Sequence, residues 1–199
     1  RMNYENFLEQ KLTRIDPVGF QVENVNPHLF DWQSQIVKWA LSRGRAALFE
    51  DCGLGKTFAQ IEWARQSGET CLIVAPLSVA RQTVRESKSI DADVTYARRQ
   101  DDVTGPGLWI TNYEMIHWFD PDEFDAVVLD ESSILKSVDG KIKSALIEQF
   151  QSVPRRLACS ATPAPNDVSE LANHAEFLGV MRRAEMLAAY FVNDEKEWR

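Results

Sequence analysis

The sequence predicts an α/β fold with a mainly parallel sheet flanked by helices. Short apolar runs rich in β-branched residues recur along the 199 residues, and turn residues and then a helical pattern follow each run. Such runs are typical of strands buried on both faces, and their alternation with helices is typical of a parallel sheet. With 44% hydrophobic and 26% charged residues, the chain has the composition of one ordinary globular core.

The expected elements follow one another in a regular order. Strands are predicted at 46–50, 71–76, 108–111, 126–130 and 155–160. Helices are predicted at 31–43, 57–67, 78–89 and 141–150, and a further helical pattern runs from 166 to 199. In the first helix, Trp32, Ile36, Trp39 and Ala40 follow helical spacing, which is typical of core residues.

Charge, cysteine content and hydropathy argue against several classes of protein. The 22 Lys and Arg against 30 Asp and Glu give a net charge of -8, which argues against a globally cationic mode of nucleic-acid binding. Cys52, Cys71 and Cys159 are odd in number and widely spaced, so we expect neither a disulfide framework nor a zinc site, and a reducing compartment fits best. No apolar run approaches the roughly 18 residues that span a bilayer, so no membrane partner is expected.

A phosphate-binding loop is predicted within the stretch ALFEDCGLGKT, residues 47–57. Such a loop needs inward-pointing backbone N–H groups after a strand, glycines that leave room for phosphates, and a lysine. Gly53, Gly55 and Lys56 meet these needs, and Thr57 is placed to bind Mg²⁺. Glu50 stands where the strict pattern has its first glycine, so the loop by itself is an imperfect match.

A pair of acidic residues ends the predicted strand at 126–130. Asp130 and Glu131 can supply one carboxylate to the shell of a Mg²⁺ ion and a neighbouring one to an attacking water molecule. Adjacent acids at a strand end are also common as turn residues. The pair gains weight because it follows a strand of the same predicted sheet, downstream of a loop that needs it.

The order of six segments resembles the first motor domain of superfamily-two helicases, especially the Swi/Snf-type translocases. The segments are FDWQ, EDCGLGKT, LIVAPLSVARQ, WITNYEM, VVLDESSILK and LACSATPAPNDVSEL. In that family the phosphate loop usually begins with an acidic pair, which Glu50 and Asp51 match. DESSILK, SATPAPND and HAEFLGVM also look like helicases encoded by phages or prophages.

The resemblance implies a RecA-like P-loop NTPase domain that uses ATP and Mg²⁺. It covers about residues 28–180, which would form the helicase ATP-binding domain. Residues 1–27 would be an N-terminal extension, and 181–199 a helical segment that leads to a second motor domain absent from this sequence.

The resemblance also implies roles for the residues of the nucleotide site. Lys56 and Thr57 would hold phosphates and Mg²⁺, Asp130 would hold Mg²⁺ through water, and Glu131 would be the general base. Gln33 would read the adenine edge, although an exposed position on an amphipathic helix explains it as well. The residues expected to bind the nucleotide are Gln33, Gly53, Leu54, Gly55, Lys56 and Thr57.

Other segments are similar to the family's nucleic-acid contacts and to its coupling motif. The candidate contacts are Pro76, Ser78, Thr111 and Asn112, with Tyr113 as a further candidate. Plain helix capping explains Ser78 equally well, and a core position explains Tyr113. Ser160, Ala161 and Thr162 resemble the coupling motif, for which a rigid turn is the alternative. Ser133 departs from the pattern, because many relatives have a histidine there.

The predicted function is the N-terminal ATP-binding domain of a DNA helicase or translocase in the cytoplasm of a bacterial or phage-infected cell, with RNA as the alternative track. A second RecA-like domain of the same full-length chain would supply arginine fingers, so these 199 residues are expected to bind ATP weakly and to hydrolyse it poorly. Two alternatives stay open: a motor subunit of a restriction or recombination complex, and a nucleotide-dependent scaffold with little catalysis.

Overall fold

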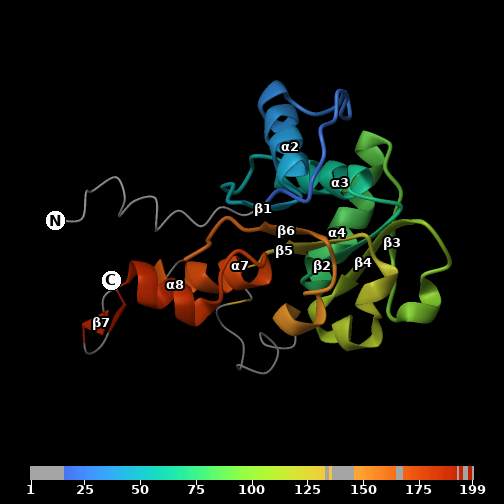
Figure 1. Cartoon of the computed structure of the whole chain (residues 1–199). Helices are drawn as coiled ribbons and strands as arrows, with labels where there is room; N and C mark the ends of the chain where they lie inside the picture. Colours follow the sequence, from blue (N-terminus) through green and yellow to red (C-terminus); the bar gives the residue numbers. More distant parts are fainter. Residues whose placement is uncertain are drawn as a thin grey trace.

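A six-stranded parallel sheet forms the centre of the molecule (Figure 1). The computed structural model describes residues 16–132, 135, 146–164, 168–191, 193–194 and 197–198. The strands are β1 (Arg45–Leu48), β2 (Thr70–Ala75), β3 (Val94–Tyr96), β4 (Gly107–Asn112), β5 (Ala126–Asp130) and β6 (Arg155–Cys159). They lie in the order β1-β6-β5-β2-β4-β3, and every neighbouring pair is parallel. The predicted α/β class with a RecA-like parallel sheet is therefore confirmed.

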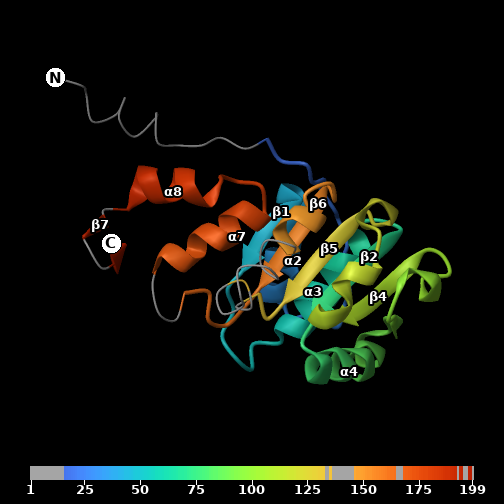
Figure 2. The same ribbon diagram turned by 90° about the horizontal axis from the view of Figure 1, so that it is seen from below.

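Helices cover both faces of this sheet. The α-helices are α2 (Asp31–Arg43), α3 (Lys56–Gln66), α4 (Leu77–Glu86), α7 (Leu171–Phe177) and α8 (Arg183–Tyr190). The short 3-10 helices are η1 (Ser87–Ile90), η2 (Gln100–Asp102), η3 (Tyr113–Trp118), η4 (Pro121–Glu123) and η5 (Val168–Glu170). In Figure 1, α2 and α3 lie above the sheet, whereas α7 lies below its β1 and β6 side. Figure 2 shows the strands side by side from below, with α7 and α8 next to β1 and β6.

The two faces of the sheet belong to two separate parts of the core. Along β2, Cys71 and Ile73 pack toward the cluster that contains residues of α2, α3 and α4. Leu72 and Val74 point the other way, into the cluster that contains η3, residues 146–153 and Phe177. Because successive side chains of a strand alternate between faces, both sides of β2 are buried, as its uninterrupted apolar run predicts.

Most predicted elements appear within two residues of their expected bounds. The helix at 31–43 and the strand at 126–130 have the predicted limits, and each of the other predicted strands is found. The predicted helix at 78–89 divides into α4 and η1. The three-residue strand β3 was not predicted, because DVTY is too short and too polar to stand out as a strand. Of the helix predicted at 141–150, only 146–150 lies among the described residues.

The predicted helical pattern at the C-terminal end is only partly correct. α7 and α8 are helices, but they are separated at Gly179, whose φ is 68°, and the helix ends at Phe191 in extended backbone. Beyond it, β7 (Asn193–Asp194) and β8 (Glu197–Trp198) pair as antiparallel strands. Asn and Asp favour turns and caps over helix interiors, which is a physical reason why the helix does not continue.

Residues 16–27 run along the domain and do not form a helix or strand. Val18 N–H donates to Arg43 O and Phe20 N–H to Leu41 O, while Val22 and Val25 pack on the core. This part of the predicted N-terminal extension therefore belongs to the packed body. Among the helices that the structure describes, none is long and apolar enough to cross a bilayer.

A buried arginine sits beneath the turn that joins α7 to α8. Arg156 is 1% exposed, and its guanidinium donates to Phe150 O at 3.5 Å and to Leu178 O at 3.4 Å. Burial, helped by the nearby Arg45 cation, lowers the pKa of Arg156 to about 10. A Cβ on Gly179 would lie 2.6 Å from Arg156 Nη2. The turn therefore requires glycine both for its left-handed backbone and for its close approach to this guanidinium.

We expect Gly179→Ala to lower the free energy of unfolding by about 2–3 kcal/mol, because backbone strain and a steric clash act together. The matched control is Gly53→Ala, because Gly53 has a comparable φ of 84° and its Cβ would meet nothing within 4 Å. That variant isolates the strain and should lose about 1 kcal/mol. Urea unfolding of both variants measures the difference, and equal losses would contradict the role given to Arg156.

Candidate nucleotide site

The predicted phosphate loop lies at the carboxyl end of β1 and leads directly into α3. Gly53 and Gly55 have φ values of 84° and 74°, a left-handed conformation that other residues rarely adopt. Gly55 is the N-cap residue of α3, so the helix begins at Lys56, and Thr57 is its second residue. The N-terminus of this helix supplies free backbone N–H groups and a positive dipole end, which suit phosphate oxygens.

The two predicted acids lie at the carboxyl end of β5. Asp130 is 3% exposed, and its carboxylate accepts hydrogen bonds from Gln60 Nε2 and from the Glu131 backbone N–H, both at 2.9 Å. Burial raises the pKa of Asp130, while the bond from Gln60 and the charge of Lys56 oppose that change. Glu131 Oε2 lies 3.9 Å from Lys56 Nζ. The structure thus brings the phosphate loop and the acidic pair together.

One cavity of about 540 Å³ contains both halves of this site. Its lining residues are Asp51, Cys52, Gly53, Gly55, Lys56, Thr57, Phe58, Val79, Gln82, Glu86, Asp130 and Glu131. Lys56 supplies the cation of this lining, and Asp51, Glu86, Asp130 and Glu131 supply its four carboxylates. A cavity with one lysine and several acids suits a polyanion bound together with a divalent cation better than a free anion.

Gln33 is fastened to the phosphate loop. Its Nε2 donates to Leu54 O at 3.0 Å and to Gly55 O at 3.3 Å, and its Oε1 accepts the Phe30 N–H at 2.9 Å. The side chain is 1% exposed, so its alternative interpretation as an exposed polar residue is wrong. In this conformation its amide groups bond within the protein, and the predicted role in reading adenine stays a prediction.

We expect Gln33→Ala to weaken ATP binding about 10-fold, equivalent to about 1.4 kcal/mol, because two loop carbonyls lose their shared donor. Gln35→Ala, an exposed position on the same helix, is the control. Titrating both ATP and GTP separates two roles. If Gln33 only holds the loop, both nucleotides weaken equally, and a selective loss of ATP would instead support adenine reading.

The predicted coupling residues lie beside the acidic pair. Ser160 is buried at the end of β6, where its hydroxyl donates to Glu131 Oε1 at 3.3 Å and accepts the Thr162 N–H at 3.0 Å. Ala161 is half-buried, and Thr162 is exposed. Ser160 therefore links this segment physically to Glu131. Ser133, the predicted departure from the family, lies outside the described residues.

The predicted nucleic-acid contacts differ in their exposure. Ser78 is exposed near the start of α4, and Pro76 is the N-cap residue there. The capping role considered for Ser78 is wrong, because the N-cap residue of α4 is Pro76, with φ -57° and ψ 145°. The helix therefore begins at Leu77, one residue before Ser78, and has no side-chain cap. Thr111 is fully buried, and Asn112 is 3% exposed with its Oδ1 bonded to Tyr96 OH. A nucleic-acid backbone contact needs exposed groups, which Ser78 supplies, whereas Pro76 is half-buried.

Several contacts within the site do not follow from the sequence analysis, and one residue that makes them, Gln60, was not found from the sequence. Gln60 lies one helical turn after Lys56, so helical spacing alone could have placed it on the same face of α3. Tyr113 is 4% exposed and its hydroxyl donates to Asp130 O at 2.7 Å, which supports the core interpretation. Glu50 is 6% exposed, and burial raises its pKa while Lys56 opposes this. No local pattern distinguishes such tertiary contacts.

The described residues fit Mg²⁺ and ATP as cofactors. A Cβ at Gly53 would meet nothing within 4 Å, so the space beside this glycine of the cavity lining is open. Within the described ranges there is no cluster of three or more His, Cys, Asp or Glu that could hold a metal by itself. Mg²⁺ commonly uses one or two protein ligands together with water and phosphate oxygens, which Asp130 and Thr57 suit.

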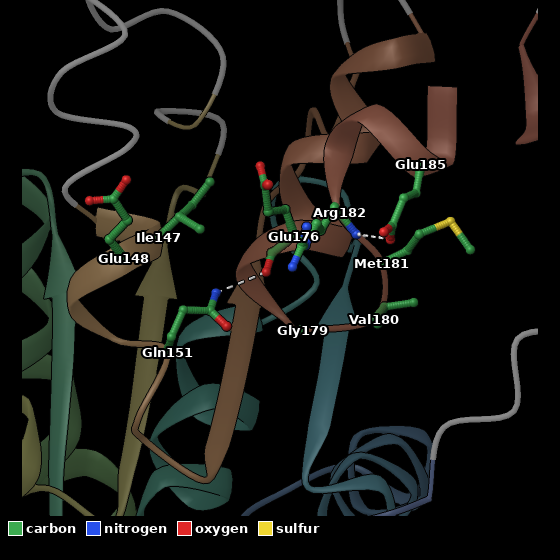
Figure 3. A pocket seen from close by; sticks show the side chains of 9 residues that line it. All are labelled: Ile147, Glu148, Gln151, Glu176, Gly179, Val180, Met181, Arg182 and Glu185. Atoms are coloured by element: carbon green, nitrogen blue, oxygen red, sulfur yellow. Dashed lines mark hydrogen bonds between the residues drawn. The ribbon is translucent and has the colours of Figure 1, made fainter. Parts of the chain in front are cut away.

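A second hollow lies on the other side of the molecule, between residues 147–151 and the α7–α8 turn (Figure 3). Its volume is about 490 Å³, and Gln151 Nε2 donates across it to Glu176 O at 3.0 Å. Figure 3 shows Glu148, Glu176 and Glu185 around it. It has neither the glycine loop nor the lysine of the first cavity and is not the candidate site.

Known proteins resemble this chain both in sequence and in fold. No family model matches the chain. It is 28% identical over 189 residues to a SWI/SNF-related matrix-associated actin-dependent regulator of chromatin subfamily A-like protein 1 from Xenopus tropicalis. The match covers 84% of this chain and 18% of that protein. Most of this chain is therefore similar in sequence to a part of a SWI/SNF-related protein.

Solved structures share the fold of this chain. The Sulfolobus solfataricus SWI2/SNF2 ATPase core in complex with dsDNA matches with a TM-score of 0.71 at 22% identity, over 85% of this chain and 41% of that one. The UvsW helicase from bacteriophage T4 matches with a TM-score of 0.59 at 15% identity, over 92% of this chain and 67% of that one. The chain thus spans less than half of the SWI2/SNF2 core and under a fifth of the curated relative.

Proposed function

We propose that the chain is the N-terminal ATP-binding domain of a DNA-dependent motor ATPase, a helicase or translocase that couples ATP hydrolysis to movement on DNA. The observation that carries the proposal is the single cavity in which Lys56 and Thr57 face Asp130 and Glu131. A loop that binds phosphate supports nucleotide binding in general, whereas the facing acids support hydrolysis.

In the proposed mechanism, residues at the carboxyl ends of β1, β5 and β6 bind and hydrolyse ATP. Lys56 and the backbone N–H groups of the loop bind the β- and γ-phosphates, and Asp130 with Thr57 holds the hydrated Mg²⁺ ion. When bound, a Mg²⁺ ion held by these two residues would offset the negative charge of the phosphates. Glu131 orients the attacking water and accepts its proton. Ser160, bonded to Glu131, would transmit changes at this carboxylate toward Thr162 and α7.

A second RecA-like domain of the same full-length chain is the proposed partner across this cleft. It would supply the arginine fingers that stabilise charge on the transferring phosphoryl group. The partial coverage of the SWI2/SNF2 core supports this arrangement. On this proposal residues 28–180 are the ATP-binding domain, residues 181–199 lead to its partner, and the isolated 199 residues bind ATP weakly and turn it over poorly.

DNA is the proposed track because one structural relative is a SWI2/SNF2 core in complex with dsDNA. Pro76 and Ser78 would contact its backbone at the start of α4, where the free N–H groups of a helix suit phosphate. Two alternatives keep parts of the proposal: a motor subunit of a restriction or recombination complex, and a nucleotide-dependent scaffold. The proposed location is the cytoplasm of a bacterial or phage-infected cell.

ATP turnover by the protein that includes the second motor domain tests the proposal, with and without duplex DNA, single-stranded DNA and RNA. We expect turnover to rise about 10-fold or more with one class of DNA and to disappear in Lys56→Ala. Equal stimulation by RNA would move the track to RNA. Turnover that is lost in Lys56→Ala but indifferent to every nucleic acid would favour the scaffold or another partner.

A further inference from the structure

The backbone at Glu131 adopts a strained conformation that needs support from neighbouring residues. Its φ is 54°, in the left-handed region, which costs a non-glycine residue on the order of 1–2 kcal/mol. Such a residue persists only where its surroundings fix it. What fixes the acidic turn, defined as Asp130 to Ser132, therefore also sets the direction of the Glu131 carboxylate.

Two of the contacts that hold the acidic turn come from the sheet itself. Asp130 Oδ1 accepts the Glu131 N–H at 2.9 Å, and the Ser132 N–H donates to Cys159 O at 2.8 Å. Both contacts belong to the carboxyl ends of β5 and β6. They tie the turn to the strands but not to any element that could move relative to them.

A further contact comes from helix α7, in addition to those that Gln60, Tyr113 and Ser160 make with this turn. His174 Nε2 and Ser132 Oγ are 3.0 Å apart, and the two residues are 2% and 0% exposed. A hydrogen bond removed from water in this way is costly to leave unmade. One residue earlier on the helix, Asn173 Nδ2 donates to Leu135 O at 3.1 Å. Helix α7 is therefore attached at two points to the chain around and after the acidic turn.

The same imidazole also touches the other half of the site. The rings of His174 and Phe49 meet edge to face, with centroids 5.4 Å apart and an interplanar angle of 84°. Phe49 immediately precedes Glu50 and the phosphate loop. One buried side chain of α7 thus contacts the residue that leads into the loop and the residue that follows Glu131.

We infer that His174 is a positioning residue that couples helix α7 to Glu131 and to the start of the phosphate loop. A shift of α7 changes the support of the strained turn, and so changes the aim of the carboxylate that orients water. The inference rests on the proposed function for its consequence in ATP hydrolysis. The mechanical part, that His174 holds both segments, is a property of the chain without any ligand.

Three variants separate positioning from simple packing. His174→Leu fills the buried position with an apolar side chain and removes the hydrogen bond. His174→Gln keeps a polar group near the position of Nε2, and Ser132→Ala removes the partner. His117→Leu, an exposed histidine on η3, is the control. Hydrogen–deuterium exchange of the nucleotide-free chain reports on residues 49–53 and 131–132, with the buried amides of α3 as an internal reference.

We expect His174→Leu to speed exchange about 10-fold in both segments while the α3 amides stay unchanged, because local opening and global unfolding are separate events. Ser132→Ala should have the same effect at residues 131–132, and His174→Gln should restore much of the protection. In the protein with its second motor domain, kcat should fall about 10-fold in His174→Leu while KM for ATP changes less than about 3-fold.

Two results would overturn the inference. One is an even rise in exchange across the domain, which indicates a merely structural histidine. The other is exchange in both segments that matches the wild type. Failure of the wild-type protein with its second motor domain to bind ATP would instead overturn the proposed function, and the exchange result would still decide whether His174 holds the turn.

Discussion

Replacing Lys56 by alanine is expected to weaken ATP binding by the protein that includes the second motor domain about 100-fold or more, equivalent to about 2.7 kcal/mol. The cavity lining contains one cation, Lys56, and four carboxylates, so without the lysine a polyanionic nucleotide meets an acidic surface. The lysine also opposes the raised pKa values of Glu50 and Asp130, and its loss favours their protonated forms. Both effects act against a bound magnesium–nucleotide pair.

Equilibrium titration with a fluorescent ATP analogue measures this change. Lys38→Ala is the control, because Lys38 lies on α2 and donates to Glu23 O away from the cavity. The fold should be retained in Lys56→Ala, since the contact between Lys56 and Glu131 is 3.9 Å long and partly exposed, and such pairs contribute little. Unchanged ATP affinity in a folded Lys56→Ala protein would contradict the role of the phosphate loop in ATP binding.

Replacing Glu131 by glutamine is expected to lower ATP turnover by about 10²–10⁴-fold and to leave ATP affinity within about 3-fold of the wild type. The amide keeps the shape of the side chain and an oxygen that can accept from Ser160 Oγ, but it cannot take a proton from water. Binding and chemistry should therefore separate in this variant, which would accumulate in the ATP-bound state.

Single-turnover hydrolysis beside the binding titration makes the comparison in the protein with its second motor domain. Glu148→Gln is the matched control, because Glu148 is an exposed carboxylate at the hollow of Figure 3. A Glu131→Gln protein that hydrolyses ATP at the wild-type rate would show that another group is the base. Parallel loss of binding and turnover would indicate that Glu131 holds the nucleotide instead.

Much of the fold follows from local features of the sequence. The buried strands can be predicted because they are unbroken apolar runs. The end of the helix at 31–43 can be predicted from Gly44, a residue that readily adopts the left-handed conformation found there. Strand β3 is not predicted, because three residues are too few to show the alternation of a strand. Its position is set by its pairing with β4. The strand order cannot be read from local features, because it depends on how the connections cross the sheet.

The candidate site divides in the same way. Lys56, Thr57, Asp130 and Glu131 stand out because glycine spacing and acids at a strand end are local patterns. Gln60, Tyr113 and His174 do not, because each acts through a partner 17 to 70 residues away. Exposure also could not be foreseen: Thr111 looked like a surface contact, yet the side chain is fully enclosed.

Calorimetric titration of the protein that includes the second motor domain with ATP, with and without Mg²⁺, tests the central claim most directly. If the cavity between the phosphate loop and the acidic turn is a magnesium–nucleotide site, one ATP should bind per chain, and removing Mg²⁺ should weaken that binding about 10-fold or more. Absence of saturable binding, or binding that is indifferent to Mg²⁺, would contradict the account.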